Sequence, residues 1–166
     1  MEINQNQMSL VESVLADSPF KPYRYIIDSK GENDSKEFWS EKVVEDLEKS
    51  PTYLITESSQ SSMDGFAIIN ALDWDSKIFN KRMAILSEFV LNPKIENKAW
   101  VADQILQRSI LKAKDEGFEF LMCKACTDDI ITIHTLEKAG FLLVDTLLDY
   151  EVDFRKVVFN KIPVPE

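Results

Sequence analysis

The sequence predicts an α+β (mixed α/β) domain built on a mixed sheet. Apolar residues recur at helical spacing before Pro51, three strand-like segments follow one another, and helices then alternate with strands. Consecutive strands joined by turns pair antiparallel, whereas strands joined by a helix pair in parallel. The order therefore predicts a central, mostly antiparallel sheet of six to seven strands flanked by helices.

Two helices and a short strand are predicted in the N-terminal third of the chain. Apolar spacing predicts a helix over residues 7–16, and a short strand follows over 23–27. A second helix is expected to begin at Asp34, because Asp34 and Glu37 have the spacing of a capping box. Pro51 ends this helix, since the residue before a proline disfavours helical geometry.

A β-meander is predicted next. Residues 52–56 and 65–72 are strand-like and are separated by the polar segment 57–64, which predicts a hairpin with a long, loose tip. Residues 82–91 are expected to form the third and longest strand of the same meander.

The rest of the chain changes to a helical period and then alternates. A helix over residues 101–113 is expected to stop at Gly117, and a buried strand follows over 118–125. Asp129 favours the start of another helix, because a carboxylate is stabilised at a helix N-terminus, and Gly140 ends that helix. Final strand material is predicted over residues 141–146 and 147–154.

Charge and hydropathy exclude two classes of function. The chain carries 19 basic and 29 acidic residues, a formal net charge of −10, which repels phosphate backbones and argues against nucleic-acid binding. Its apolar runs are far shorter than the ~20 residues that a membrane span needs. The first residues lack the basic and then apolar order of a signal peptide, so we expect a cytoplasmic protein without membrane contact.

The two cysteines, Cys123 and Cys126, have CxxC spacing but are interpreted as reduced core thiols. A redox pair of this kind opens a helix, whereas Cys123 ends a predicted buried strand. Structural zinc would need a second pair of ligands, and His134 is the only histidine. We therefore predict no metal site, and we expect His134 on the exposed side of its helix.

Two segments resemble the GNAT (GCN5-related N-acetyltransferase) superfamily. Residues 133–144, with the string Leu-Glu-Lys-Ala-Gly-Phe, are similar to its last helix and strand. Residues 71–79, which contain Leu-Asp-Trp-Asp-Ser, together with 144–150 resemble a narrower set that includes dTDP-fucosamine acetyltransferase. The resemblance covers roughly residues 52–156 and implies a GNAT-like (acyl-CoA N-acyltransferase) fold.

The resemblance also implies a division of the chain. Members of the narrower set contain two successive GNAT-like halves, of which the second carries the cofactor, and this chain resembles the first half. We expect residues 1–50 to be a helical segment joined to the fold, residues 51–157 to be the GNAT-like core, and residues 158–166 to be a proline-rich linker or tail.

In the family, a glycine-rich loop at a helix N-terminus holds the pyrophosphate of acetyl-CoA. The matching segment here, residues 92–100, has no glycine, contains a proline without an N–H, and ends in a tryptophan. If the cofactor binds at all, the resemblance assigns it to the residues that open the helix, namely Asn97, Lys98 and Ala99.

The catalytic groups implied by the resemblance are incomplete. Leu136 stands where the family commonly has a tyrosine that acts as general acid, and leucine donates no proton. Glu88 is the candidate base, with a solvated glutamate on a strand edge as the alternative. Trp74 and Asp75 are candidates for positioning a sugar or amine. The alternative for this segment is that Trp74 covers the core while Asp75 and Ser76 cap a short helix over residues 77–80.

Three functional interpretations follow. The leading one is a degenerate acetyltransferase-like domain, the non-catalytic half or scaffold beside a catalytic GNAT half in the same chain or a homodimer partner. The second is an active acetyl-CoA-dependent N-acyltransferase acting on a small amine or amino-sugar. The third is a stand-alone ligand-binding module, with no cofactor.

Overall fold

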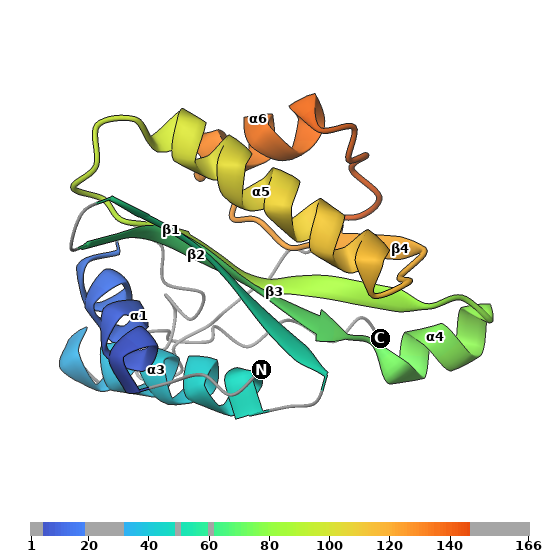
Figure 1. Ribbon diagram of the computed structural model, residues 1–166, viewed down its shortest axis with the longest axis horizontal. Coiled ribbons are helices and arrows are strands. Elements are labelled where there is room, and N and C mark those ends of the chain that lie inside the picture. The colour runs from blue at the N-terminus through green and yellow to red at the C-terminus, as the bar shows by residue number, and fades with distance from the viewer. Residues whose placement is uncertain (1–4, 19–31, 49–50, 60–61, 147–166) are drawn as a thin grey trace, which may run out of the picture.

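The computed structural model describes residues 5–18, 32–48, 51–59 and 62–146 (Figure 1). These ranges contain five helices and four strands. In chain order the elements are α1 (Gln5–Asp17), α3 (Glu32–Glu48), β1 (Thr52–Ser59), β2 (Ser62–Ala71), α4 (Asp73–Phe79), β3 (Met83–Leu91), α5 (Lys98–Asp115), β4 (Phe120–Cys123) and α6 (Ile130–Lys138). Among these described helices, none combines the length and the apolar character needed to cross a membrane.

The four strands form one mixed sheet in the order β1-β2-β3-β4. The pairs β1–β2 and β2–β3 are antiparallel, and β3–β4 is parallel. Helices α1 and α3 cover one face of this sheet, and α5 and α6 cover the other (Figure 1). The predicted mixed sheet flanked by helices is thereby confirmed in its coarse form.

The predicted six to seven strands are not found in the described residues, which hold four. Residues 141–146 are described and form no strand, because no described strand pairs with them, and Leu142, Leu143 and Val144 are exposed. The predicted strands over 23–27 and 147–154 lie outside the described residues, as does the predicted tail.

Each face of the sheet carries its own apolar core. On the α1/α3 side, Phe66, Ile68 and Val90 pack with helix residues that include Val11, Val14, Leu15, Trp39 and Val43. On the α5/α6 side, Ala67, Ile69 and Leu86 pack with residues that include Val101, Ile105, Leu106 and Leu136. Because β2 is buried on both faces, it appears as a continuous apolar run rather than an alternating one.

The hairpin between β1 and β2 is more regular than its polar sequence predicts. The expected loose tip over residues 57–64 is wrong, because the ladder continues through a bulge at Glu57/Ser58 to the pair Ser59 and Ser62. The Ser59 hydroxyl donates to Asp64 Oδ1 at 2.9 Å, and Arg108 of α5 forms an ion pair with Glu57 at 2.7 Å. These contacts replace water as partners of the polar side chains.

Helix ends were predicted well where the signal is local. Gly117 and Gly140 have φ values of +76° and +89°, the left-handed conformation expected of glycine after a helix. The Asp129 carboxylate accepts a hydrogen bond from Thr132 N at 3.1 Å and caps α6 as expected. The capping box at Asp34 is wrong, because α3 begins at Glu32 and Asp34 therefore lies inside the helix.

Gly65 lies in β2 beneath α5, and replacing it with alanine should destabilise the fold. The added Cβ would stand 2.8 Å from the Val90 carbonyl oxygen and 2.9 Å from Ile105 Cδ1, and the backbone oxygen has no room to retreat. We expect Gly65→Ala to lower the free energy of unfolding by about 2–3 kcal/mol in urea titrations.

Gly140→Ala is the matched control for this substitution, since its Cβ would meet nothing within 4 Å and only the positive φ is strained. It should cost about 1 kcal/mol. An equal or larger loss at Gly140 would show that the close packing of β2 beneath α5 is not the limiting constraint.

Candidate acyl-transfer site

Glu88 faces the α1/α3 side of the sheet because β3 contains one extra residue. Ile69 of β2 pairs with Leu86, but the next residue, Ile68, pairs with Glu88, so Ser87 is left over as a β-bulge. Leu86 accordingly packs in the α5/α6 core, while Glu88 reaches Trp39 on α3.

The surroundings of Glu88 favour its neutral form. The pKa of its carboxyl group is raised to about 7. Burial is the largest cause and the charge of Asp46 adds to it, whereas a hydrogen bond from Trp39 and the charge of Lys42 act in the opposite direction. Trp39 Nε1 donates to Glu88 Oε2 at 3.3 Å. The alternative of a solvated glutamate does not fit, because the side chain is half-buried and its carboxylate accepts the hydrogen bond from Trp39.

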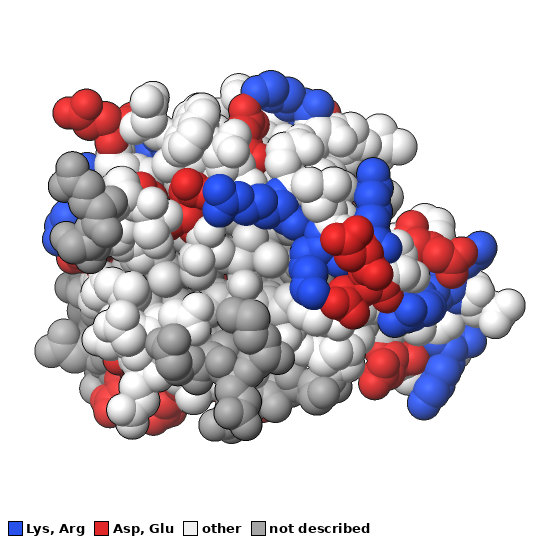
Figure 2. Space-filling view, viewed as in Figure 1, with Lys and Arg blue, Asp and Glu red and all other residues white. Residues whose placement is uncertain are grey.

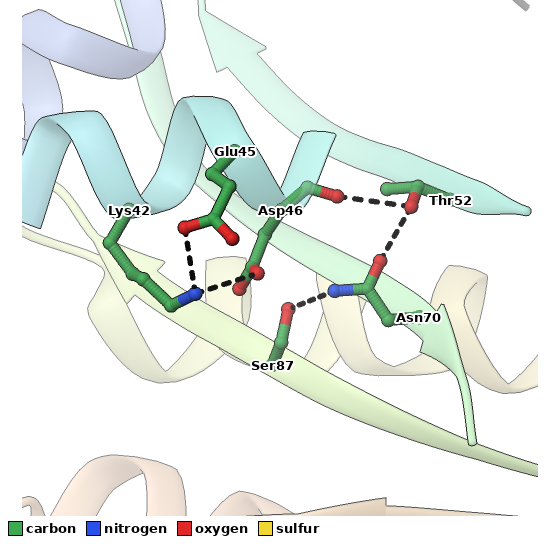
Figure 3. Close-up of polar contacts among 6 residues, drawn as sticks. All are labelled: Lys42, Glu45, Asp46, Thr52, Asn70 and Ser87. Atoms are coloured by element: carbon green, nitrogen blue, oxygen red, sulfur yellow. Dashed lines mark hydrogen bonds and ion pairs between the residues drawn. The ribbon is translucent and has the colours of Figure 1, made fainter. Parts of the chain in front are cut away.

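A polar network that includes Ser87, the neighbour of Glu88 in the sequence, lies between α3 and the sheet (Figure 3). Asn70 of β2 donates from Nδ2 to Ser87 Oγ at 2.9 Å and accepts at Oδ1 from the Thr52 hydroxyl at 2.6 Å. The same hydroxyl lies 3.0 Å from the Asp46 carbonyl oxygen, which links β1 to the end of α3. The bulged Ser87 is thus held by side chains as well as by the ladder.

Lysine and acid side chains of α3 complete this network. Lys42 Nζ lies 3.0 Å from Glu45 and 3.7 Å from Asp46 (Figure 3). These residues carry no sequence motif that marks them as part of a site. The available signal was Asn70, a single amide inside the otherwise apolar end of β2, because a buried amide needs hydrogen-bond partners.

The parallel pair β3–β4 ends next to Glu88. Pairing runs from Met83 and Phe120 to Leu86 and Cys123, while β3 continues to Leu91. Beyond Leu86, β3 has no parallel partner within the described residues. Glu88 therefore lies just beyond the point where the described pairing of the two strands ends.

The cysteines are not a redox pair in this arrangement. Neither forms a disulfide, and Cys123 is half-buried whereas Cys126 is exposed, so the prediction of two core thiols is wrong for Cys126. Burial raises the pKa of the Cys123 thiol to about 12, with smaller contributions from Asp129 and Glu88, so it is protonated at neutral pH. Within the described residues no group of three or more His, Cys, Asp or Glu could hold a metal ion.

The candidate cofactor residues lie at the far end of β3 from α4, where the chain enters α5. Asn97 and Ala99 are exposed and Lys98 is half-buried, and α5 has no side-chain cap. In the preceding turn, Asn92 accepts two hydrogen bonds from backbone amides. Its Oδ1 accepts one from Lys94 N at 3.0 Å, and its carbonyl oxygen accepts the other from Ile95 N at 3.4 Å.

This turn fits a pyrophosphate poorly. Pro93 has no N–H, and the amides of Lys94 and Ile95 are already used within the turn. Glu96 adds a negative charge beside the free amides of α5, and Trp100 projects from the first helical turn with 54% of its surface exposed. Lys94 forms an ion pair with Asp17 at 2.5 Å, so its charge is already compensated.

The remaining candidates are dispersed. Leu136 is buried in the α5/α6 core at 8% exposure, and His134 is exposed as expected. Trp74 and Asp75 lie on α4 beside Met83, at the opposite end of β3 from Asn97; nine strand residues at about 3.3 Å each separate the two ends by roughly 26 Å. The structure therefore brings neither of them together with the α5 residues.

The alternative structural interpretation of the Trp74 segment is also wrong. Trp74 is 70% exposed and does not cover the core. The helix spans Asp73–Phe79, so Asp75 and Ser76 lie inside it, and α4 has no side-chain cap. The Ser76 hydroxyl instead accepts a hydrogen bond from Met83 N at 2.9 Å, which ties α4 to the start of β3.

The raised pKa of Glu88 makes stability depend on pH. Its folded value of about 7 exceeds the ordinary value of 4.5, so the folded protein binds more protons than the unfolded chain between these values. The contribution of Glu88 to stability therefore falls as the pH rises from 4.5 to 7, and above 7 the buried charge has its full cost. Glu88→Gln should raise the free energy of unfolding at pH 8, by about 3 kcal/mol at most, and change it little at pH 4.5.

Urea unfolding of both proteins across this pH range measures the difference. Glu137→Gln, which removes an exposed carboxylate on α6, is the matched control for the loss of one acidic group. A difference between wild type and Glu88→Gln that is the same at pH 4.5 and 8 would contradict the environment described for this carboxyl group.

Comparison with solved structures identifies the fold. An aminoglycoside 6′-N-acetyltransferase from Acinetobacter haemolyticus superposes with a TM-score of 0.63 at 10% identity, covering 92% of this chain and 96% of that one. The enzyme AAC(6')-Iy in complex with the bisubstrate analogue CoA-S-monomethyl-acetylneamine gives 0.60 at 12% identity, covering 92% and 96%.

A third structure, from Desulfovibrio desulfuricans and assigned to acetyltransferases of the GNAT family, gives a TM-score of 0.65 at 14% identity and covers 87% of this chain and 84% of that one. No family model matches the sequence, and no curated protein is similar to it. At these identities the comparison shows the fold alone, and the chain has the fold of GNAT acetyltransferases.

Proposed function

We propose that this chain is a GNAT-like domain that does not transfer acetyl groups itself and acts as the non-catalytic half or scaffold of an acetyl-CoA-dependent N-acetyltransferase. The observation that carries the proposal is the turn before α5. Asn92 holds the amides of Lys94 and Ile95, Pro93 has none, and Glu96 stands beside the helix N-terminus. A pyrophosphate would meet only the uncapped first amides of α5, in a segment without glycine and beside the negative charge of Glu96.

The position of Leu136 supports the same conclusion. Its side chain is part of the α5/α6 core, packed with residues of α5 and the sheet. A leucine donates no proton to a departing thiolate, so a catalytic phenol would have to come from elsewhere in the chain. Leu136 therefore contributes to the stability of the fold and not to proton transfer.

A scaffold role needs a partner that supplies the missing chemistry. We propose that this partner is a catalytic GNAT half in the same chain, which would bind acetyl-CoA and a small amine. The alternative partner is a second copy of this chain, which would assemble with it without supplying the missing groups. The closeness of the dTDP-fucosamine set and the cytoplasmic location expected from the sequence stay predictions. The fold itself is compatible with either role, because one fold supports many functions.

One observation favours a second candidate, an active acetyl-CoA-dependent N-acyltransferase on a small amine or amino-sugar. Glu88 is a half-buried carboxyl group with a pKa of about 7, beside the point where β3 and β4 part. A general base works best when its pKa lies near the working pH. Glu88 could therefore accept a proton from an amine, and the start of α5, from Asn97 to Ala99, would then have to hold the cofactor without glycines.

Calorimetric titration with acetyl-CoA separates the two candidates. For the scaffold we expect no saturable binding up to about 500 μM ligand, which corresponds to a free energy of association weaker than about −4.5 kcal/mol. Cooperative thermal unfolding of the same sample confirms that the protein tested is folded.

A dissociation constant in the micromolar range would contradict the scaffold proposal. The variant Lys98→Glu then locates the binding, because a charge reversal in the first turn of α5 should abolish binding of pyrophosphate at that helix. Lys114→Glu, at the other end of α5, makes the same change of net charge and is the matched control, which should leave the affinity unchanged.

A further inference from the structure

Helix α4 is a short helix with an uncovered apolar face. None of its residues is buried, and Trp74, Ile78 and Phe79 are 70%, 60% and 61% exposed. Figure 1 shows α4 at one end of the sheet, away from the helix pairs that cover the two faces. Three large side chains exposed together on seven residues differ from the scattered apolar residues of an ordinary surface.

The inner side of α4 is firmly attached, which fixes the direction of the outer face. Ser76 accepts from Met83 N at 2.9 Å, and Leu72 N donates to the Met83 carbonyl oxygen at 2.9 Å. Asn80 ends the helix in the left-handed conformation at φ 52°. A helix of seven residues is unstable in isolation, so these contacts, and not the apolar face, hold it in place.

The charges beside the apolar face are self-complementary. Trp74 and Ile78 are four residues apart and share one side of the helix, and Asp73 and Lys77 are four residues apart on one flank of that side. Within the described residues neither Asp73 nor Lys77 has an ion-pair partner, whereas the neighbouring Lys81 pairs with Glu119 at 2.8 Å.

An antiparallel copy of the same helix satisfies these features together. A two-fold axis at the level of Asp75 brings Asp73 of one helix opposite Lys77 of the other, and the reverse. It also buries Trp74 and Ile78 of both helices against each other. We propose that α4 forms a two-fold interface with α4 of a second copy of this chain.

The surroundings of α4 allow two acidic chains to approach at this end. Lys and Arg side chains alternate with Asp and Glu over this end of the molecule (Figure 2), so the net charge of −10 is not concentrated there. Phe120 of β4 pairs with Met83 next to α4 and is 53% exposed, which extends the apolar surface. Stable interfaces bury about 800 Å² per partner, and this surface supplies only part of that, so we expect association in the micromolar range.

This interface is independent of the proposed function. Helix α4 lies at the Met83 end of β3, and the turn that precedes α5 follows the Leu91 end. The dimer is expected whether or not acetyl-CoA binds. A result that contradicts the scaffold proposal does not contradict the dimer proposal, and the reverse also holds. The partner is a second copy rather than a different protein because, under two-fold symmetry, Asp73 and Lys77 of one helix each face the opposite charge on the other helix.

Sedimentation equilibrium of the full chain between about 1 and 300 μM tests the interface. We expect a monomer–dimer equilibrium, and Asp73→Lys and Lys77→Asp should each weaken it at least tenfold by placing like charges opposite one another. An equimolar mixture of the two variants should associate within about threefold of the wild-type affinity, because each lysine of one chain then faces an aspartate of the other. Asp75→Lys, which makes the same charge change off that flank, is the control and should change the affinity less than threefold.

Three results would overturn the proposal. They are a wild-type chain that is monomeric throughout, a dimer that neither charge variant weakens, and charge variants that remain monomeric when mixed. Trp74→Ser gives a second measure, since it should abolish the dimer while the circular dichroism spectrum stays that of the folded wild type. A dimer that persists in Trp74→Ser would likewise count against α4.

Discussion

In β3, Ser87 is inserted between Leu86, which packs toward α5, and Glu88, which faces Trp39 of α3. Side chains alternate along a strand, so a regular β3 would turn Glu88 into the α5/α6 core and Phe89 away from it. The bulge prevents this, and Phe89 and Leu91 remain on the α5/α6 side while Val90 packs with α1 and α3. Both cores and the position of the candidate base depend on this bulge, which accommodates Ser87 without turning over the rest of β3.

Three places along β3 have different roles in the account. Its first residue, Met83, anchors α4 and so orients the proposed dimer surface. Its middle residue, Glu88, occupies the point where β4 diverges and carries the most acyltransferase-like feature of the chain. Its end leads into the turn at Asn92, which is closed by its own hydrogen bonds. The proposed scaffold role rests on the third place, whereas the alternative of an active enzyme rests on the second.

Local signals in the sequence predicted local structure, and they succeeded for physical reasons. The stops at Gly117 and Gly140 and the cap at Asp129 depend on the conformation or side chain of a single residue, which the sequence states directly. Longer-range features were missed. The polar residues 57–64 are typical of a loop, yet much of this segment is strand. It is stabilised by the pairing between β1 and β2 and by the ion pair between Arg108 and Glu57. Exposure of Trp74 was not predictable, because large aromatic residues are usually covered.

The candidate site was predictable in part. Glu88 was identified from its place in the third strand, but its raised pKa depends on its burial and, to a smaller degree, on the charge of Asp46 of α3, far away in sequence. The network of Thr52, Asn70 and Ser87 arises from three different strands and has no sequence motif. A bulge also leaves no local signal, since Ile-Leu-Ser-Glu-Phe is compatible with a regular strand until its partner is known.

Deletion of Ser87 tests the role of the bulge most directly. Removing this residue should restore a regular strand and leave every other side chain of β3 on its present face, so the protein should still unfold cooperatively in urea with a loss of about 1–2 kcal/mol for the lost Asn70–Ser87 hydrogen bond and local readjustment. Deleting Phe89 instead would reverse the facing of Val90 and Leu91 and should abolish the cooperative transition. Loss of cooperative unfolding on deletion of Ser87, to the same degree as on deletion of Phe89, would contradict the account.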